Sequence, residues 1–396
     1  MNERKLRKAL LGIAPPDEIG AQRRAWRVVR TDFGEREPSP WPIRHRRPVA
    51  AVAIAVAVLA AALTPPGRAV IDEVRDVVGT EKVVGIPQAK PALFSLPAQG
   101  RVLVSAPSGV WIVSANGSRR NLGDYDEATW SPRGLFVGVS KRHQLAAVTP
   151  KDEVRWTLSR PNVHDPRWSP SGFRIGYLSG SNLRVVAGDG TGDRRIDAAQ
   201  DVAPAWRPGA EHVLAYADRG GTVTVIETDT NQTLWTAAGV AARPTQLEWS
   251  ADATRLLVVR ELAAGRFALV VFDAGGRRVQ TLEFPGNFVD AAFAPNNHRI
   301  AVVRRLGPRS ELLVVEADTL RRQQAVFGGL GRFNDVAWSP GARWLLLGWE
   351  SADQWLFIRS ADVSKVKANS SLAVQFDPGG TGATDFPRIE GWCCPK

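Results

Sequence analysis

The feature that most constrains this chain is a short motif that recurs about every 40 residues. Close copies read Trp130-Ser131-Pro132-Arg133-Gly134, Trp168-Ser169-Pro170-Ser171-Gly172 and Trp338-Ser339-Pro340-Gly341, and degraded copies begin at Trp206, Trp249 and Phe293. These six aromatic positions are separated by 38, 38, 43, 44 and 45 residues. A fixed period of this length is typical of the four-stranded blades of a β-propeller.

The same order of short apolar strands follows each aromatic residue. Proline at the second position of the turn and glycine at the fourth favour a type I turn, and the aromatic ring is large enough to fill the space between neighbouring blades. Residues 101–122 supply three strands of a further blade, and residues 93–96 are a candidate for its fourth strand. The predicted fold is therefore an all-β propeller over residues 92–377, with seven blades, or six if residues 92–122 pack irregularly.

Two segments compete to complete the first blade of this ring. Residues 371–377 (SLAVQFD) either close the ring by pairing with the first blade or replace residues 93–96 as its strand. The sequence leaves both arrangements open.

The motif Trp-Ser-Pro-x-Gly, followed by an apolar strand, resembles the WD-like repeat of TolB-type β-propellers over roughly residues 95–370. TolB is periplasmic and binds protein partners, so the resemblance implies an extracytoplasmic, protein-binding bacterial propeller. Two departures weaken the functional part of this inference. The common Pro-Asp-Gly core of the motif is never intact here, and we expect no counterpart of the N-terminal α/β domain of TolB.

Residues 48–67 carry no charge, and Val49–Leu63 is almost purely Ala, Val, Ile and Leu. Twenty such residues are enough to cross a bilayer core as a helix. Arg44, Arg46 and Arg47 precede the run, which by the positive-inside rule places the N-terminus in the cytoplasm and the propeller outside. A cleaved signal peptide is the competing interpretation, but a 47-residue leader is longer than a normal n-region. We therefore expect an uncleaved single-pass anchor in the cell membrane.

The leader, residues 1–47, holds twelve Lys/Arg residues against six Asp/Glu residues. Within it, residues 17–33 have the spacing of a basic amphipathic helix, with Arg23, Trp26, Arg27 and Arg30 as candidate partner-binding residues. A solvated charged helix is the alternative. Residues 68–91 are expected to form a short juxtamembrane helix and a proline-containing spacer.

Composition and motifs argue against several classes of function. The net charge is +11, but the repeats show no basic stripe interleaved with aromatic residues, so we expect no nucleic-acid partner. No Gly-x-Ser-x-Gly, phosphate-binding loop or His-Glu-x-x-His occurs, and the five histidines are scattered. We therefore expect no catalytic residues, no metal and no cofactor.

Acidic and amide side chains precede the aromatic residue in most repeats. The innermost strand of each blade lines the central channel of a propeller, so these side chains should converge on one mouth of it and bind a cation or a basic peptide. The alternative is that they cap loop backbone before the strand. The candidate residues are Asp126, Glu127, Asp165, Asp201, Gln246, Asp290 and Asp335.

The C-terminal tail, residues 378–396, contains the adjacent pair Cys393 and Cys394. In an oxidising compartment the two thiols could form a vicinal disulfide, pair with another chain or bind a thiophilic metal. A plain terminus is the alternative.

Three functions fit these features. The first is a membrane-anchored extracytoplasmic propeller that binds a protein, a peptide or an envelope ligand. The second is a transmembrane regulator, anti-sigma-like in layout, whose basic helix binds a cytoplasmic partner. The third, an enzyme that uses the channel, is disfavoured by the lack of a recurring nucleophile or His–carboxylate arrangement.

Overall fold

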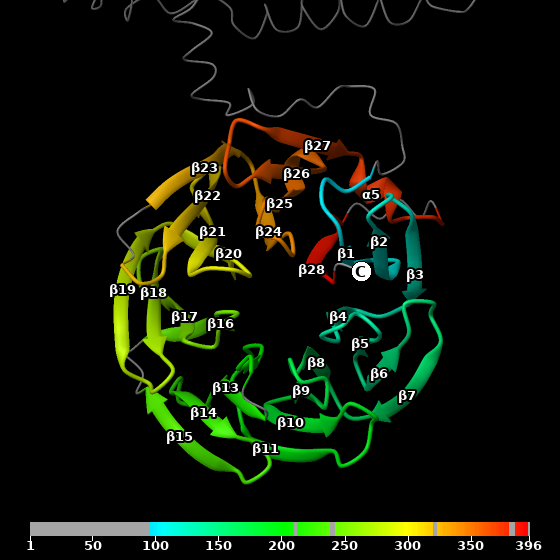
Figure 1. Ribbon diagram of the computed structural model, residues 1–396, viewed down its shortest axis with the longest axis vertical. Coiled ribbons are helices and arrows are strands. Elements are labelled where there is room, and N and C mark those ends of the chain that lie inside the picture. Colours follow the sequence, from blue (N-terminus) through cyan, green and yellow to red (C-terminus); the bar gives the residue numbers. More distant parts are fainter. Residues whose placement is uncertain (1–94, 210–211, 238–241, 320–322, 380–384, 395–396) are drawn as a thin grey trace, which may run out of the picture. The chain divides into compact units, whose positions relative to one another are not determined.

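A computed structural model of the chain describes residues 95–209, 212–237, 242–319, 323–379 and 385–394. These residues form seven antiparallel sheets of four strands each, arranged as a ring of blades (Figure 1). The prediction of a seven-bladed propeller is confirmed. The expected leader, membrane helix and juxtamembrane segment lie outside the described residues. Within the described ranges, no helix combines the length and apolar character that crossing a membrane requires.

The strands of each blade are given from the channel outwards. Blade 1 contains β28 (Arg388–Cys393), β1 (Arg101–Ala106), β2 (Gly109–Ser114) and β3 (Arg119–Gly123). Blade 2 contains β4 (Glu127–Trp130), β5 (Val137–Lys141), β6 (Gln144–Val148) and β7 (Val154–Ser159). Blade 3 contains β8 (Val163–Trp168), β9 (Arg174–Ser179), β10 (Asn182–Ala187) and β11 (Arg194–Ala198).

The remaining blades repeat this order. Blade 4 contains β12 (Ala205–Trp206), β13 (Val213–Ala217), β14 (Val223–Glu227) and β15 (Gln232–Ala237). Blade 5 contains β16 (Arg243–Trp249), β17 (Arg255–Leu262), β18 (Arg266–Asp273) and β19 (Arg278–Pro285). Blade 6 contains β20 (Asn287–Phe293), β21 (Arg299–Leu306), β22 (Arg309–Glu316) and β23 (Gln323–Leu330). Blade 7 contains β24 (Phe333–Trp338), β25 (Trp344–Trp349), β26 (Gln354–Arg359) and β27 (Val366–Ser370), with a short 3₁₀ turn, η2 (Glu350–Ala352).

The recurring motif ends the innermost strand of blades 2 to 7 and forms the turn to the next strand. Its serine is buried, and in blade 3 the Ser169 hydroxyl accepts a hydrogen bond from the Arg174 backbone N–H at 3.0 Å. Ser131, Ser250 and Ser339 make the equivalent bond in their own blades. Gly172 has a φ of +83°, a conformation that glycine adopts without steric cost. The motif is therefore a structural turn.

The aromatic residue of the motif packs against the preceding blade. The backbone of Gly138 on β5 leaves room for the Trp168 ring, and Phe136 stacks on that ring with centroids 6.2 Å apart. Trp206 and Trp338 also donate their indole N–H across the blade boundary, to the carbonyls of Arg167 and Ala292 at 2.8 and 2.9 Å. The aromatic side chain of the motif thus joins neighbouring blades both by packing and by hydrogen bonding.

The ring is closed by β28, which pairs antiparallel with β1 and completes blade 1. The sequence offered residues 93–96 and 371–377 for this strand, and both predictions were wrong: neither residues 95–96 nor residues 371–377 form a strand, and residues 93–94 lie outside the described residues. Part of the expected tail, residues 378–396, supplies the innermost strand instead. Residues 371–377 contain the short helix α5 (Leu372–Gln375), in which Leu372 is buried, and Phe376 follows directly. Leu372 and Phe376 are four residues apart, so one helical turn brings both to the core. A strand would turn Val374 to the same side as these two residues, but Val374 is exposed.

We expect the closing strand to hold much of the stability of the ring. Trp392 on β28 is 7% exposed and contacts Phe357 edge to face, with centroids 5.8 Å apart. The change Trp392→Ala should lower the free energy of unfolding in urea by about 3–5 kcal/mol, because it leaves a cavity in the core. Val374→Ala, in the segment that does not close the ring, should change it by less than about 0.5 kcal/mol, since Val374 is 73% exposed. Equal losses in the two variants would contradict this closure.

Candidate functional site

The innermost strands surround a central cavity of about 750 Å³. It is lined by residues of β4, β8, β16, β20, β24 and β28 and by the segment before β12. Its lining residues include seven carboxyl groups and two guanidinium groups: Glu127, Asp165, Asp201, Glu248, Asp290, Asp335 and Glu390, with Arg167 and Arg388. The cavity is therefore acidic, although the whole chain has a net charge of +11.

The structure brings together six of the seven residues that the sequence places at the channel. Glu127, Asp165, Asp201, Gln246, Asp290 and Asp335 all line the cavity. Asp126 does not: it is exposed and lies outside the lining. Neighbouring residues of an extended chain point to opposite sides, so Asp126 faces away when Glu127 faces the channel.

Most of these side chains hydrogen bond to the backbone of the next blade. The Asp290 carboxylate accepts from the Val336 N–H at 2.9 Å, and Asp335 accepts from the Ile389 N–H at 2.9 Å. Innermost strands of neighbouring blades do not pair with each other, so their channel-side N–H groups need other partners. We call these side chains inter-blade caps; they are Glu127 to Asp165, Gln246 to Ala291, Glu248 to Phe293, Asp290 to Val336 and Asp335 to Ile389.

Burial raises the pKa of five carboxyl groups of the cavity, four of them caps. It raises the pKa of Glu248 to about 8 and that of Asp290 to about 7, and the charges of Asp290 and Asp335, respectively, add to the shift. Burial also raises the pKa of Glu127, Asp335 and Glu390. Burial lowers the pKa of Arg388, but the nearby carboxylates, Glu390 first, outweigh it, so the pKa is raised overall. Glu248 and Asp290 can therefore hold or release a proton near neutral pH.

Asp165 and Asp201 differ from the caps, because neither carboxylate bonds to a neighbouring blade's backbone in the structure. Asp165 lies 4.0 Å from the guanidinium of Arg167, and Asp201 lies 3.0 Å from Nε2 of His164. The Asp201 side chain is 72% exposed. These two carboxylates are the acidic groups of the channel most accessible to a ligand.

Two groups of described residues bring metal-ligating atoms within 4.8 Å of one another. One is His164, Asp165 and Asp201 at the channel, and the other is His212, Glu227 and Asp229 in blade 4. The sequence did not reveal the first group, since His164 and Asp201 are 37 residues apart, the first in β8 of blade 3 and the second after β11. His164 already uses both ring nitrogens, Nδ1 on the Asn162 carbonyl and Nε2 on Asp201, so a metal would have to displace these contacts.

Sequence reasoning missed four charged residues of the cavity: Arg167, Glu248, Arg388 and Glu390. Glu248 stands directly before Trp249, whereas most of the candidate residues stand three residues before the aromatic residue of their repeat. Arg388 and Glu390 belong to β28, in the segment expected to be a tail. A further tryptophan, Trp392, at the end of an Arg-Ile-Glu-Gly run was the available sign of a seventh inner strand.

The other candidate residues have different outcomes. Arg23, Trp26, Arg27 and Arg30 lie outside the described residues. Cys393 and Cys394 are joined by a disulfide at the end of β28, and Cys394 Sγ lies 3.8 Å from the Pro132 carbonyl oxygen in the motif turn of blade 2. The pair therefore stands where blade 1 meets blade 2.

Comparison with known proteins supports the fold and adds nothing on function. No protein-family model matches this chain, and no curated protein sequence matches it. The solved structure of KlHsv2, with loop 6CD replaced by a Gly-Ser linker, is similar with a TM-score of 0.51 at 14% identity, over 66% of this chain and 89% of that chain. At this identity the likeness shows the fold alone.

Two further solved structures match less well. Hydrazine synthase of Kuenenia stuttgartiensis gives a TM-score of 0.48 at 14% identity, over 59% of this chain and 76% of that chain. The β-propeller domain of Cps50 (Swd1) from Myceliophteria thermophila gives 0.49 at 11% identity, over 70% of this chain and 98% of that chain. These likenesses are too low to carry an argument.

The raised pKa of Glu248 predicts a pH-dependent penalty on stability. In the unfolded chain the pKa of this carboxyl is near its ordinary value of 4.5, and in the folded chain burial raises it to about 8. Folding therefore favours the protonated form, and stability falls as pH rises between these two values. Glu248→Gln removes the charge and keeps an acceptor for the Phe293 N–H. At about pH 9 this variant should be more stable than the wild type by roughly 2–4 kcal/mol, and at about pH 5 the two should be nearly equal.

Thermal and urea unfolding across this pH range measure the difference. Glu261→Gln is the matched control, because Glu261 is an exposed carboxylate on the same blade. If Glu248→Gln and Glu261→Gln follow the same profile against pH, the buried position of Glu248 is not the source of the effect.

Proposed function

We propose that this propeller is a binding module whose central channel receives a basic segment of a protein or peptide ligand. The observation that carries the proposal is the concentration of seven carboxyl groups in one cavity of a basic chain. A lysine or arginine side chain entering this cavity would meet a cluster of carboxyl groups with low-dielectric walls, and its positive charge would favour their ionised forms.

The division of the carboxyl groups favours binding over catalysis. The caps are held by backbone N–H groups of the next blade, and a group held in this way is poorly placed to move during a reaction. Asp165 and Asp201 are accessible and are oriented by Arg167 and His164. They would form the first contacts of a cationic ligand.

The proposal predicts that neutralising these two carboxylates weakens binding of a basic peptide. The double variant Asp165→Asn/Asp201→Asn should lower the affinity for an oligo-lysine peptide by at least about tenfold, measured by calorimetry at low salt. An oligo-glutamate peptide should not bind.

The control for this experiment is Asp273→Asn/Asp362→Asn. Both residues accept hydrogen bonds from turn backbone outside the channel, and asparagine retains that acceptor. Unchanged oligo-lysine affinity in the channel variant, or an equal loss in the control, would refute a channel site.

We further propose that residues 48–67 anchor the chain in the membrane as a single-pass helix, with residues 1–47 in the cytoplasm and the propeller outside. The uncharged run and its preceding arginines, Arg44, Arg46 and Arg47, support this arrangement. The resemblance of the motif to TolB-type propellers agrees with it.

The proposed topology predicts the activity of reporter fusions. Alkaline phosphatase, which requires export to be active, should be active when fused after residue 90 and inactive when fused after residue 40. An inactive fusion after residue 90 would overturn the orientation, provided the fusion protein is present in equal amount.

A regulatory function remains the second candidate, supported by the basic amphipathic pattern around Arg23, Trp26, Arg27 and Arg30. Deleting residues 1–40 separates the two proposals. A pure binding module should keep its affinity for a basic peptide and its cellular function. A regulator should keep this affinity but lose its effect on the cytoplasmic partner.

A further inference from the structure

Arg260 is a buried arginine without a carboxylate partner among the described residues. It lies on β17 in blade 5 and is 2% exposed. Its Nη1 donates to the carbonyls of Ala242 at 2.8 Å and Gly221 at 3.3 Å. A guanidinium stays charged inside a protein, and a buried charge without a counter-charge is strongly unfavourable.

Blade 6 has an arginine at the same strand position, and there it has a carboxylate partner. Arg304 on β21 occupies the place in its strand that Arg260 occupies in β17, and it stands directly opposite Glu311. The Arg304 Nη2 atom lies 2.7 Å from Oε2 of Glu311. In blade 5, the residue opposite Arg260 is Ala268. The arginine is thus retained and its carboxylate is replaced by a methyl group.

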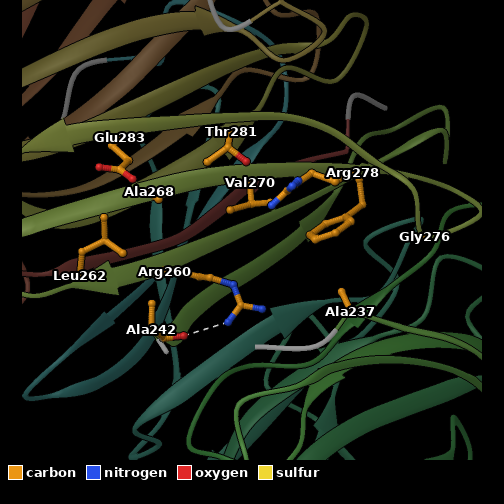
Figure 2. A pocket seen from close by; sticks show the side chains of 11 residues that line it. Ala237, Ala242, Arg260, Leu262, Ala268, Val270, Gly276, Arg278, Thr281 and Glu283 are labelled. Atoms are coloured by element: carbon orange, nitrogen blue, oxygen red, sulfur yellow. Dashed lines mark hydrogen bonds between the residues drawn. The ribbon is translucent and has the colours of Figure 1, made fainter. Parts of the chain in front are cut away.

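A cavity of about 300 Å³ lies where that carboxylate is missing. Ala268 lines it together with Arg260, and Leu262, Val270 and Phe272 give it an apolar wall. In Figure 2, Arg260 with its hydrogen bond to Ala242 lies on one side, and Arg278 and Thr281 lie on the other. Glu283, the acidic residue of the lining, is paired with Arg266.

We propose that this cavity binds a small organic carboxylate, whose anionic group takes the place on Arg260 that Glu311 takes on Arg304. The planar guanidinium presents a fork of donors that matches a carboxylate. Arg278 adds a second positive charge at the exposed side of the cavity, and the apolar wall covers the body of the ligand. The volume is at the small end of the range for pockets that enclose organic ligands.

The lining favours an organic carboxylate over inorganic phosphate. Phosphate has polar oxygens on every side, and burying them against Leu262, Val270 and Phe272 would leave hydrogen bonds unmade. An organic carboxylate instead places its anionic group on Arg260 and its apolar body against the apolar wall. This site is separate from the central channel and does not rest on the function proposed for it.

The experiment titrates the full-length chain with benzoate, with neutral benzamide and with inorganic phosphate. Benzoate should bind the wild type, and benzamide and phosphate should bind at least about tenfold more weakly. Ala268→Glu supplies the internal carboxylate that blade 6 has, and Arg260→Gln removes the charge while keeping a donor for the Ala242 carbonyl. Each variant should weaken benzoate binding by at least about tenfold.

Arg277→Gln is the matched control, because Arg277 is an arginine of the same blade whose side chain is 85% exposed and pairs with Asp273 outside the cavity. It should bind benzoate as the wild type does. Circular dichroism and thermal unfolding establish that each variant is folded, and if Ala268→Glu does not fold, Arg260→Gln decides alone. The proposal is overturned if the wild type does not bind benzoate, if benzamide or phosphate binds as tightly, or if folded Arg260→Gln retains wild-type affinity.

Discussion

The propeller depends on satisfying the channel-side edges of its innermost strands. Each inner strand pairs with one neighbour in its own blade, and its other edge faces the channel, where no strand is available. Buried backbone N–H groups need partners, so side chains of the preceding blade supply the acceptors. The bonds from Asp290 to Val336 and from Asp335 to Ile389 show the arrangement most clearly. Among the described residues, these caps link blade 2 to 3, blade 5 to 6, blade 6 to 7 and blade 7 to 1 on the channel side.

This solution has an electrostatic cost that creates the candidate site. Carboxylates are strong acceptors for N–H groups, but gathering them in one cavity desolvates them and sets their charges against each other. The raised pKa values of Glu248 and Asp290 are the result. Structural capping and an acidic channel are therefore two consequences of the same residues. Three channel carboxyl groups, Asp165, Asp201 and Glu390, lie outside the caps, and the first two pair with Arg167 and His164.

Two blades depart from the internal repeat, one in a side-chain pair and the other in its connectivity. Blade 6 pairs Arg304 with Glu311, whereas blade 5 keeps Arg260 and places Ala268 opposite it, beside a cavity. Blade 1 departs in its connectivity, since its innermost strand comes from β28 at the far end of the chain. By pairing with β1, that strand closes the ring. The Cys393–Cys394 disulfide lies at the end of β28, next to the motif turn of blade 2.

The sequence by itself favoured seven blades over six and predicted the motif turns and the approach of Glu127, Asp165, Asp201, Gln246, Asp290 and Asp335 to one channel, because period, turn chemistry and alternation are local properties repeated many times. Only the tertiary structure decided which segment closes the ring and that four of the six predicted channel residues, Glu127, Gln246, Asp290 and Asp335, cap the next blade. It also revealed Glu248, Arg388 and Glu390 in the channel and the missing partner of Arg260. These features depend on contacts between residues 38 or more positions apart or between opposite strands, and a local pattern carries no information about such contacts.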